Sequence, residues 1–326
     1  MTTPTLSDRS RQLSPAREAK RRLFMRVLGV VPFAVKLWIA RNIAPNLVRY
    51  LPAGHSVVIP DYAGRYRVRL STDFPIETMM IVGRYEVVTR LVVERLVQPG
   101  DQCIDVGANI GGITFLIVAR AGDAGRVLAF EPAPSTFARL RYNVELNPEL
   151  NGRLVPVQAG LGERPGELQL VEDHATPGNA SLHAVGGVVV PVTTLDAAIV
   201  KHGLSRLDFM KIDVEGMEYE VLCGAKAALE AWRPTMYFET MVENDRARGT
   251  PAFALIEDLL LPMDYRLFDV KGHGSLVPAT RAGYGANTLA VPAGRVEMVR
   301  SALARVGGVV ERGDGLAERS DLSRLL

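Results

Sequence analysis

A glycine-bearing turn between an apolar strand and an apolar helix constrains this chain more than any other feature. The turn spans residues 105–111, after a predicted strand at 102–106 and before a helix predicted from about 112 to 122. Glycines in such a turn let the backbone approach a ligand closely at the N-terminus of the helix. Glu131 follows at the end of a second predicted strand, where an acid commonly accepts hydrogen bonds from ribose hydroxyls. The spacing predicts a βαβ unit that binds a nucleoside.

Asp105 distinguishes between two kinds of nucleoside ligand. In dinucleotide-binding folds the turn binds a pyrophosphate, and a carboxylate two residues before the first glycine, Gly107, would repel that anion. S-adenosylmethionine has no phosphate, and Asp105 would attract its ammonium and sulfonium cations directly or through water. The residues therefore favour S-adenosylmethionine. A nicotinamide cofactor and a purely structural glycine turn remain as alternatives.

Length and charge describe one large domain, or one domain with an extension. The chain has 326 residues, 48% of them hydrophobic, and 38 Lys and Arg against 36 Asp and Glu. Residues 1–26 carry a net charge of +5, which leaves the remainder near −3, so the body does not have the charge of a nucleic-acid binder. Two cysteines form neither a disulfide framework nor a metal site, and no cluster has metal-ligand spacing, which favours a cytoplasmic protein without a metal.

An apolar stretch at 27–43 follows the basic start. Pro32 and Lys36 interrupt it and Arg26 and Arg41 bound it, whereas a membrane-spanning helix needs about 20 mostly apolar residues. Two interpretations stay open. The stretch is a helix that packs on the body or on a second copy of the chain in a homo-oligomer, or it is a basic amphipathic anchor that holds the protein peripherally at the inner membrane face.

The rest of the chain alternates between strand and helix patterns, which predicts a parallel sheet covered on both faces. Two short strands precede it within residues 55–70, and Thr193 with Asp196 has the spacing of a capping box. The segments 167–171 and 188–192 form a predicted hairpin across a polar loop. The last two strands, without a helix between them, should pair antiparallel.

Acidic residues end four of the major predicted strands, where open α/β sheets bind their ligands. These residues are Asp105, Glu131, Asp213 and Glu239. Any one of them could merely cap the following helix. Together they predict a functional edge of the sheet.

Five separate motifs in one order resemble the FkbM family of S-adenosylmethionine-dependent methyltransferases over about residues 84–292. They are Pro99–Gly111, Ala129–Pro132, Asn143–Asn147, Thr194–Asp196 and Lys211–Glu218.

The resemblance implies a class I methyltransferase fold: a Rossmann-like α/β domain with a seven-stranded, mostly parallel sheet and one antiparallel strand. An N-terminal helical and β extension would precede it. The implied segments are a basic N-terminus (1–26), a helix with a small lead-in (27–98), the methyltransferase domain (99–292), and a C-terminal helix with a charged tail (293–326). The implied reaction is O-methylation of a hydroxyl on a sugar, glycolipid or secondary metabolite.

The resemblance also implies roles for individual residues. The turn would shape the methionine side of S-adenosylmethionine, Glu131 with Pro132 would hold the ribose, and Asp213 would lie beside the transferring methyl. The turn residues concerned are Asp105, Gly107, Ala108, Asn109 and Gly111. The loop at 178–182 resembles a family segment that contacts substrate or cofactor.

Methylation of an alkyl hydroxyl calls for a nearby base, because its pKa is high. Asp213, His183 and Glu239 are the candidates, and His183 could equally be an exposed loop residue. A nicotinamide-linked oxidoreductase and a catalytically silent cofactor-binding adaptor are the alternative functions.

Overall fold

The computed structural model describes residues 33–42, 51–172, 180–181, 187–240 and 252–304. Contacts divide the chain into two compact units, Met1–Ala53 with Val306–Leu326, and Gly54–Arg305. The helix predicted in the apolar stretch is α2 (Phe33–Asn42) in the first unit. No helix in the described ranges has the length and apolarity needed to cross a membrane.

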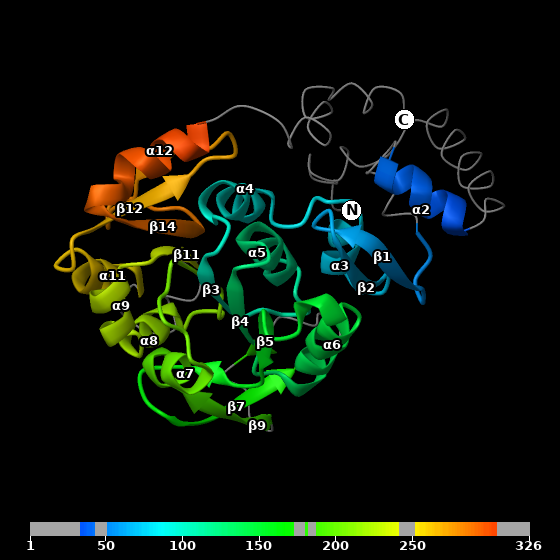
Figure 1. The fold of residues 1–326 in the computed structure, drawn as a ribbon, viewed down its shortest axis with the longest axis horizontal. Helices are drawn as coiled ribbons and strands as arrows, with labels where there is room; N and C mark the ends of the chain where they lie inside the picture. The colour runs from blue at the N-terminus through cyan, green and yellow to red at the C-terminus, as the bar shows by residue number, and fades with distance from the viewer. Residues whose placement is uncertain (1–32, 43–50, 173–179, 182–186, 241–251, 305–326) are drawn as a thin grey trace, which may run out of the picture. The chain divides into compact units, whose positions relative to one another are not determined.

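An eight-stranded sheet forms the centre of the second unit (Figure 1), in the order β13-β12-β14-β11-β10-β3-β4-β5. Its strands are β3 (Gln102–Val106), β4 (Arg126–Phe130), β5 (Leu154–Val157), β10 (Phe209–Ile212), β11 (Thr235–Glu239), β12 (Tyr265–Val270), β13 (Leu276–Pro278) and β14 (Asn287–Pro292).

Five neighbouring strands, from β5 to β11, are parallel, and β14 runs antiparallel between β11 and β12. These seven strands confirm the predicted sheet with one reversed strand, and β12 and β14 pair antiparallel as expected. The short strand β13 pairs antiparallel with β12 and adds an eighth strand at the edge, which the sequence analysis did not predict.

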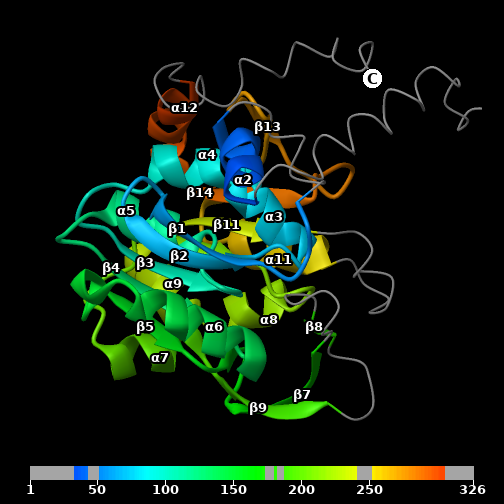
Figure 2. The same cartoon turned by 90° about the vertical axis from the view of Figure 1, so that its right-hand side faces the viewer.

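Helices cover both faces of the sheet (Figure 2). On one face, α4 contacts both α5 and α12. On the other face, α7 contacts α9, and α8 contacts α11. Helix α6 contacts β5. Their bounds are α4 (Val87–Leu96), α5 (Thr114–Ala121), α6 (Pro134–Glu145), α7 (Leu195–His202), α8 (Glu218–Cys223), α9 (Lys226–Trp232), α11 (Ala252–Leu260) and α12 (Val296–Ala304).

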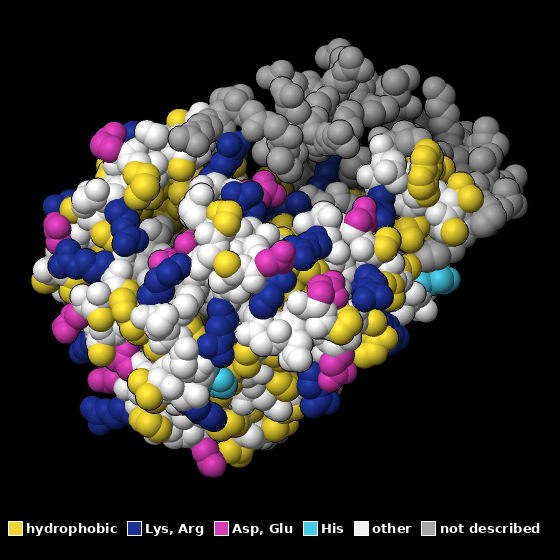
Figure 3. Space-filling view, viewed as in Figure 1, with side chains coloured by type: hydrophobic (Ala, Val, Ile, Leu, Met, Phe, Trp, Pro, Cys, Tyr) yellow, Lys and Arg dark blue, Asp and Glu magenta, His cyan; other side chains and the backbone are white. Residues whose placement is uncertain are grey.

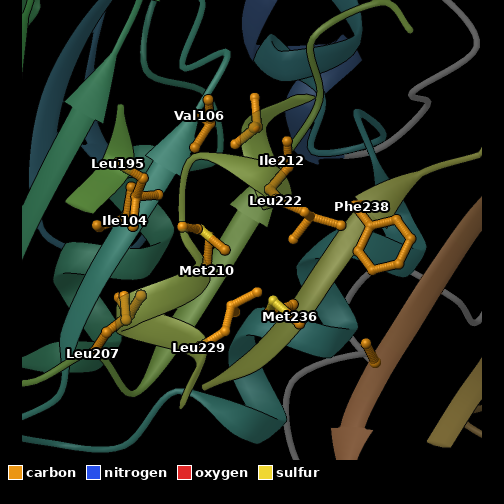
Figure 4. Close-up of a cluster of buried hydrophobic side chains, with 14 of the residues drawn as sticks. Ile104, Val106, Leu195, Leu207, Met210, Ile212, Leu222, Leu229, Met236 and Phe238 are labelled. Carbon is orange, nitrogen blue, oxygen red and sulfur yellow. The ribbon is translucent and has the colours of Figure 1, made fainter. Parts of the chain in front are cut away.

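Side chains alternate between the two faces of the sheet along β3 and β10, so the core residues and the polar residues of these strands lie on opposite faces. Ile104, Val106, Met210 and Ile212 face the cluster shown in Figure 4, which α7, α8, α9 and α11 complete. Since side chains alternate along a strand, the intervening residues of β3 and β10 point to the opposite face, toward α5.

A β-hairpin docks on the sheet domain through two buried asparagines of α6 and the turn after it. The hairpin strands are β1 (Ser56–Tyr62) and β2 (Tyr66–Ser71), as expected from residues 55–70, and α3 (Pro75–Ile81) follows. Asn143 Oδ1 accepts from the Arg69 amide, and Asn147 Oδ1 accepts from the Arg67 amide, each at 2.8 Å. Asn143 Nδ2 also donates to the Ile110 carbonyl at 3.0 Å. The hairpin and the glycine turn are thus connected by one side chain.

A smaller sheet, in the order β6-β9-β7-β8, contains the predicted hairpin. Strand β7 (Gly166–Glu172) pairs antiparallel with β9 (Val188–Thr193), and β6 (Gly160–Leu161) and β8 (Ala180–Ser181) flank them.

The predicted capping box at Thr193 and Asp196 is wrong by one residue. Thr194 is the N-cap of α7, and its Oγ1 accepts from the Ala197 amide. Asp196 instead accepts from the amides of Ala227 and Ala228 in the first turn of α9.

The connection between β10 and β11 contains two short helices, α8 and α9, with Gly224 and Ala225 between them. A Cβ on Gly224 would lie 2.1 Å from the Gly162 carbonyl oxygen, so the chain approaches another loop closely there.

The face of the molecule in Figure 3 shows Lys and Arg side chains interspersed with Asp, Glu and apolar ones, rather than gathered in one basic patch.

Candidate functional site

A cavity of about 310 Å³ opens at the carboxyl ends of β3, β4, β10 and β11. This volume is at the lower end of the range for small-molecule sites, about 300–1,000 Å³. Three groups of residues line it. Strand ends and the turns after them contribute Val106, Gly107, Asn109, Phe130, Glu131, Pro132, Asp213, Val214, Glu215, Met217 and Glu239; the lead-in contributes Ile76, Tyr85 and Glu86; and β6, β7 and β9 with Ala159 contribute Gly160, Leu161, Leu168, Leu170 and Val190.

Gly107 lets two strand ends approach each other. Its φ is +74°, and its amide donates to the Phe130 carbonyl at 3.0 Å. A Cβ there would lie 1.8 Å from the Asp213 carbonyl oxygen, so any side chain would force β3 and β10 apart. Asn109 also adopts a left-handed conformation, with φ +51°, and its Oδ1 accepts from the Ile110 amide at 2.8 Å.

Glu131 is anchored beside this turn at the end of β4. Its Oε2 accepts from the Asn109 amide at 2.9 Å and its Oε1 from the Ala133 amide at 3.0 Å. Burial raises the pKa of Glu131 to about 7, although both amides favour the charged form. The carboxylate lines the cavity in a fixed orientation, where hydroxyl groups of a ligand can donate to its remaining lone pairs.

Asp105 lies behind the turn and does not line the cavity, which differs from the ligand contact expected from the sequence. It has no exposed surface; Oδ2 accepts from Thr114 Oγ1 at 2.6 Å, and Oδ1 lies 3.5 Å from Lys211 Nζ. Burial raises the pKa of Asp105, whereas Lys211 and the Thr114 hydroxyl oppose that shift. The charge of Asp105 therefore acts on Lys211.

Lys211 is a site residue to which the sequence analysis assigned no role. Its buried Nζ lies 3.1 Å from Asp213 Oδ2 and donates to the Gly107 carbonyl at 3.0 Å, in addition to the Asp105 pair. Burial alone would lower the pKa of Lys211, but Asp213 and Asp105 together raise it. One signal was present in the sequence: a lysine within an otherwise apolar strand must have a partner when buried.

Three acids surround the end of the cavity at β10 and β11. The Asp213 side chain is 33% exposed, and Glu215 and Glu239 line the cavity beside it. Burial, followed by the charges of Asp213, Glu215 and Glu218, raises the pKa of Glu239 to about 8. Among the described residues, Glu239 Oε2 has no hydrogen-bond partner although it is buried.

The remaining predicted residues have different places. Pro132 lines the cavity, whereas Ala108 and Gly111 are turn residues that are buried and do not line it, and a Cβ on Gly111 would lie 2.7 Å from the Phe115 ring. His183 lies outside the described residues, as does most of the loop at 178–182.

Tyr85 and Glu86 line the cavity but were not predicted as site residues. They belong to a segment before the sheet, and no local pattern indicated that this segment returns to it.

The charges of the cavity wall limit which ligand fits. Five acidic side chains line it, and no Lys or Arg occurs among its described lining residues. Such a wall attracts a cation and offers acceptors to hydroxyls, but it would repel a pyrophosphate. The described part of the chain contains no cluster of three or more His, Cys, Asp or Glu residues that could hold a metal.

Comparison with known proteins agrees with this chemistry. The family described as "Methyltransferase FkbM domain" matches residues 105–267. A hexuronic acid methyltransferase, AglP of Haloferax volcanii, is 29% identical over 174 residues, which cover 53% of this chain and 69% of the relative. The 31-O-demethyl-FK506 methyltransferase FkbM of Streptomyces tacrolimicus is 32% identical over 163 residues, covering 40% of this chain and 62% of the relative. The chain thus spans only part of these relatives' lengths.

A solved structure of methyltransferase FkbM from Methylobacillus flagellatus aligns with a TM-score of 0.39 and 19% identity, and covers 58% of this chain and 43% of its own.

Proposed function

The chain belongs to the FkbM family of methyltransferases, which use S-adenosylmethionine as methyl donor, and we propose that it methylates a hydroxyl oxygen of a sugar, glycolipid or secondary metabolite. The observation that carries this proposal is the acidic cavity at the carboxyl ends of the sheet, formed around the glycine turn. Two relatives support the acceptor class by name: one acts on a hexuronic acid, and the other on a demethylated hydroxyl position of FK506.

The cavity residues fit this cofactor. Glu131 would bind the ribose hydroxyls, and Gly107, Asn109 and Pro132 would contact the rest of the nucleoside and the methionine chain. Asp105 and Lys211 would act from behind, by holding the turn and Asp213 in place. When bound, S-adenosylmethionine supplies an electrophilic methyl group on a sulfonium cation.

Asp213 is the residue we assign to the acceptor hydroxyl. Lys211 holds its Oδ2, and the rest of the carboxylate is accessible from the cavity. It would accept the hydroxyl hydrogen bond, align the oxygen with the methyl group and take the proton as the new bond forms. Glu239, with its pKa near 8, is largely protonated at neutral pH and would donate a hydrogen bond rather than act as the base.

Cofactor binding and methyl transfer can be tested separately. In calorimetry the full chain should bind S-adenosylmethionine and its demethylated product, S-adenosylhomocysteine, and should not bind NAD. Binding of NAD alone would favour an oxidoreductase. Methyl transfer to a panel of glycans, lipids and polyols would then detect catalysis, and cofactor binding without transfer to any acceptor would favour the silent adaptor.

A further inference from the structure

The strand order places Glu131 at one end of the cavity, the nucleoside end, and Asp213 and Glu239 at the other, the acceptor end. Along the sheet the strands run β11-β10-β3-β4, and Glu239, Asp213, Gly107 and Glu131 stand at or just after their carboxyl ends. Neighbouring strands are about 4.8 Å apart, so Glu239 lies on the order of 10 Å from the turn after β3, on the side away from Glu131. If Glu131 binds the ribose, the acceptor enters near Glu239 and Asp213.

The described residues at the acceptor end are acidic and carry no cation of their own. Asp213, Glu215 and Glu239 line this end, and Glu86 lines the same cavity. The nearest lysine, Lys211, is buried and already contacts two carboxylates and a carbonyl oxygen. It therefore offers nothing to a carboxylate or phosphate on the acceptor.

Glu239 needs a hydrogen-bond partner that the described residues do not supply. Its Oε2 is buried at the cavity wall and unpartnered, and buried polar atoms are nearly always satisfied in a functional complex. A hydroxyl or ammonium group of the acceptor would satisfy it. The raised pKa of Glu239, caused by burial and then by the neighbouring acids, agrees with an excess of negative charge at this end.

We propose that the acceptor is an uncharged polyhydroxyl compound or an amine-bearing one, that Asp213 and Glu215 exclude acceptors with a carboxylate or phosphate close to the methylated oxygen, and that Glu239 forms a hydrogen bond with the acceptor. This inference rests on the proposed function and narrows it. Like-charge repulsion in a confined site is an effective way to reject a wrong partner.

The test compares acceptors that share a ring and differ in the charge of one substituent. Methyl glucoside, methyl 2-amino-2-deoxyglucoside and methyl glucuronide share one ring, and catechol and protocatechuate form a second set. With saturating S-adenosylmethionine at pH 7.5, the neutral or amine members should exceed their carboxylate counterparts in kcat/KM by at least about tenfold. Saturation-transfer NMR on the complex with S-adenosylhomocysteine ranks binding of the same compounds independently of turnover.

Two variants link the preference to the acids. Glu215→Lys should reduce the ratio of neutral to anionic use by about tenfold or more, because it replaces an acid at the cavity with a cation. Glu145→Lys is the matched control, since it makes the same charge change on the exposed surface of α6 and should leave the ratio unchanged. Glu215→Gln keeps the side-chain shape, removes only the charge and should also weaken the preference, which guards against misfolding of the first variant.

Equal or better use of the carboxylate members would overturn the proposal, as would failure of every neutral and amine member to bind the cofactor complex. An unchanged ratio in both Glu215→Lys and Glu215→Gln would overturn the role of the acids. Failure of the proposed function itself is recognised separately, because the chain would then not bind S-adenosylmethionine in calorimetry.

Discussion

The titration of Glu131 makes cofactor affinity depend on pH. Its carboxylate is almost fully buried, and that burial raises its pKa to about 7 in the free protein. Ribose hydroxyls donate hydrogen bonds to the charged form, so binding must first remove the proton wherever Glu131 is protonated. The affinity for the cofactor therefore falls as the pH decreases through about 7, and it approaches its limiting value above that pH.

The magnitude follows from the protonated fraction. With a pKa of about 7, the apparent dissociation constant of S-adenosylmethionine should be roughly 11 times the limiting value at pH 6 and about 1.1 times at pH 8. The difference is about tenfold, or about 1.4 kcal/mol. Titration calorimetry between pH 6 and 8, in buffers of different ionisation enthalpy, measures both the affinity and the proton released on binding.

Two variants assign this dependence to Glu131. Glu131→Gln should bind more weakly, by about 1–3 kcal/mol, and should lose the tenfold change with pH. Glu239→Gln removes the other cavity carboxyl that has a pKa near this range and should keep the change. If wild-type affinity is flat between pH 6 and 8, or if Glu131→Gln retains the slope, the carboxylate does not receive the ribose hydrogen bonds.

Four further predictions address folding, chemistry and location. Gly107→Ala should lower the melting temperature by several degrees more than Gly152→Ala, because both glycines have positive φ but only the first would place a Cβ against a carbonyl oxygen; equal shifts would contradict the close approach of the strands. Lys211→Met should reduce the free energy of unfolding by about 3–5 kcal/mol in urea titrations, and a loss under 1 kcal/mol would show that its carboxylate partners do not need it. Asp213→Asn should bind S-adenosylmethionine almost normally yet lose roughly 10²–10⁴ in turnover, and wild-type turnover would reduce Asp213 to a structural role. If the net charge of residues 1–26 anchors the chain, the full-length protein should float with anionic but not neutral liposomes, and no lipid-dependent flotation would leave the packing-helix interpretation.

The main strands were predictable because their signals are local. The four strand-end acids marked the carboxyl ends of β3, β4, β10 and β11 to within one residue, and the missing helix between β12 and β14 implied their antiparallel pairing. The strand β13 has only three residues, Leu276–Pro278, and two of them are exposed, so it lacked the apolar pattern that identifies a strand.

Helix ends were less predictable because neighbouring residues compete for the same role. Thr193 and Thr194 both offered a capping hydroxyl, and the backbone, not the residue type, selected Thr194. Asp196 had the correct spacing for the first helix, but α9 lies beside α7 and presents the unpaired amides of Ala227 and Ala228. Only the packing of the two helices reveals that competition.

The role of Asp105 could not be derived from its charge alone, because it depends on which strand pairs with β3. The sequence analysis expected its carboxylate to attract the cofactor cation. The residue that β10 places opposite it could not be known from the sequence. In the parallel pairing of β3 with β10, Lys211 stands directly opposite Asp105, although the two are far apart in the sequence. Because alternation turns both side chains to one face, the lysine neutralises the acid internally and extends to Asp213. The cation selectivity that was attributed to Asp105 therefore falls to Glu131, Asp213 and Glu215, which line the cavity itself. Lys211 couples the glycine turn to the acid we assign to the acceptor, so a change at either position should be felt at the other.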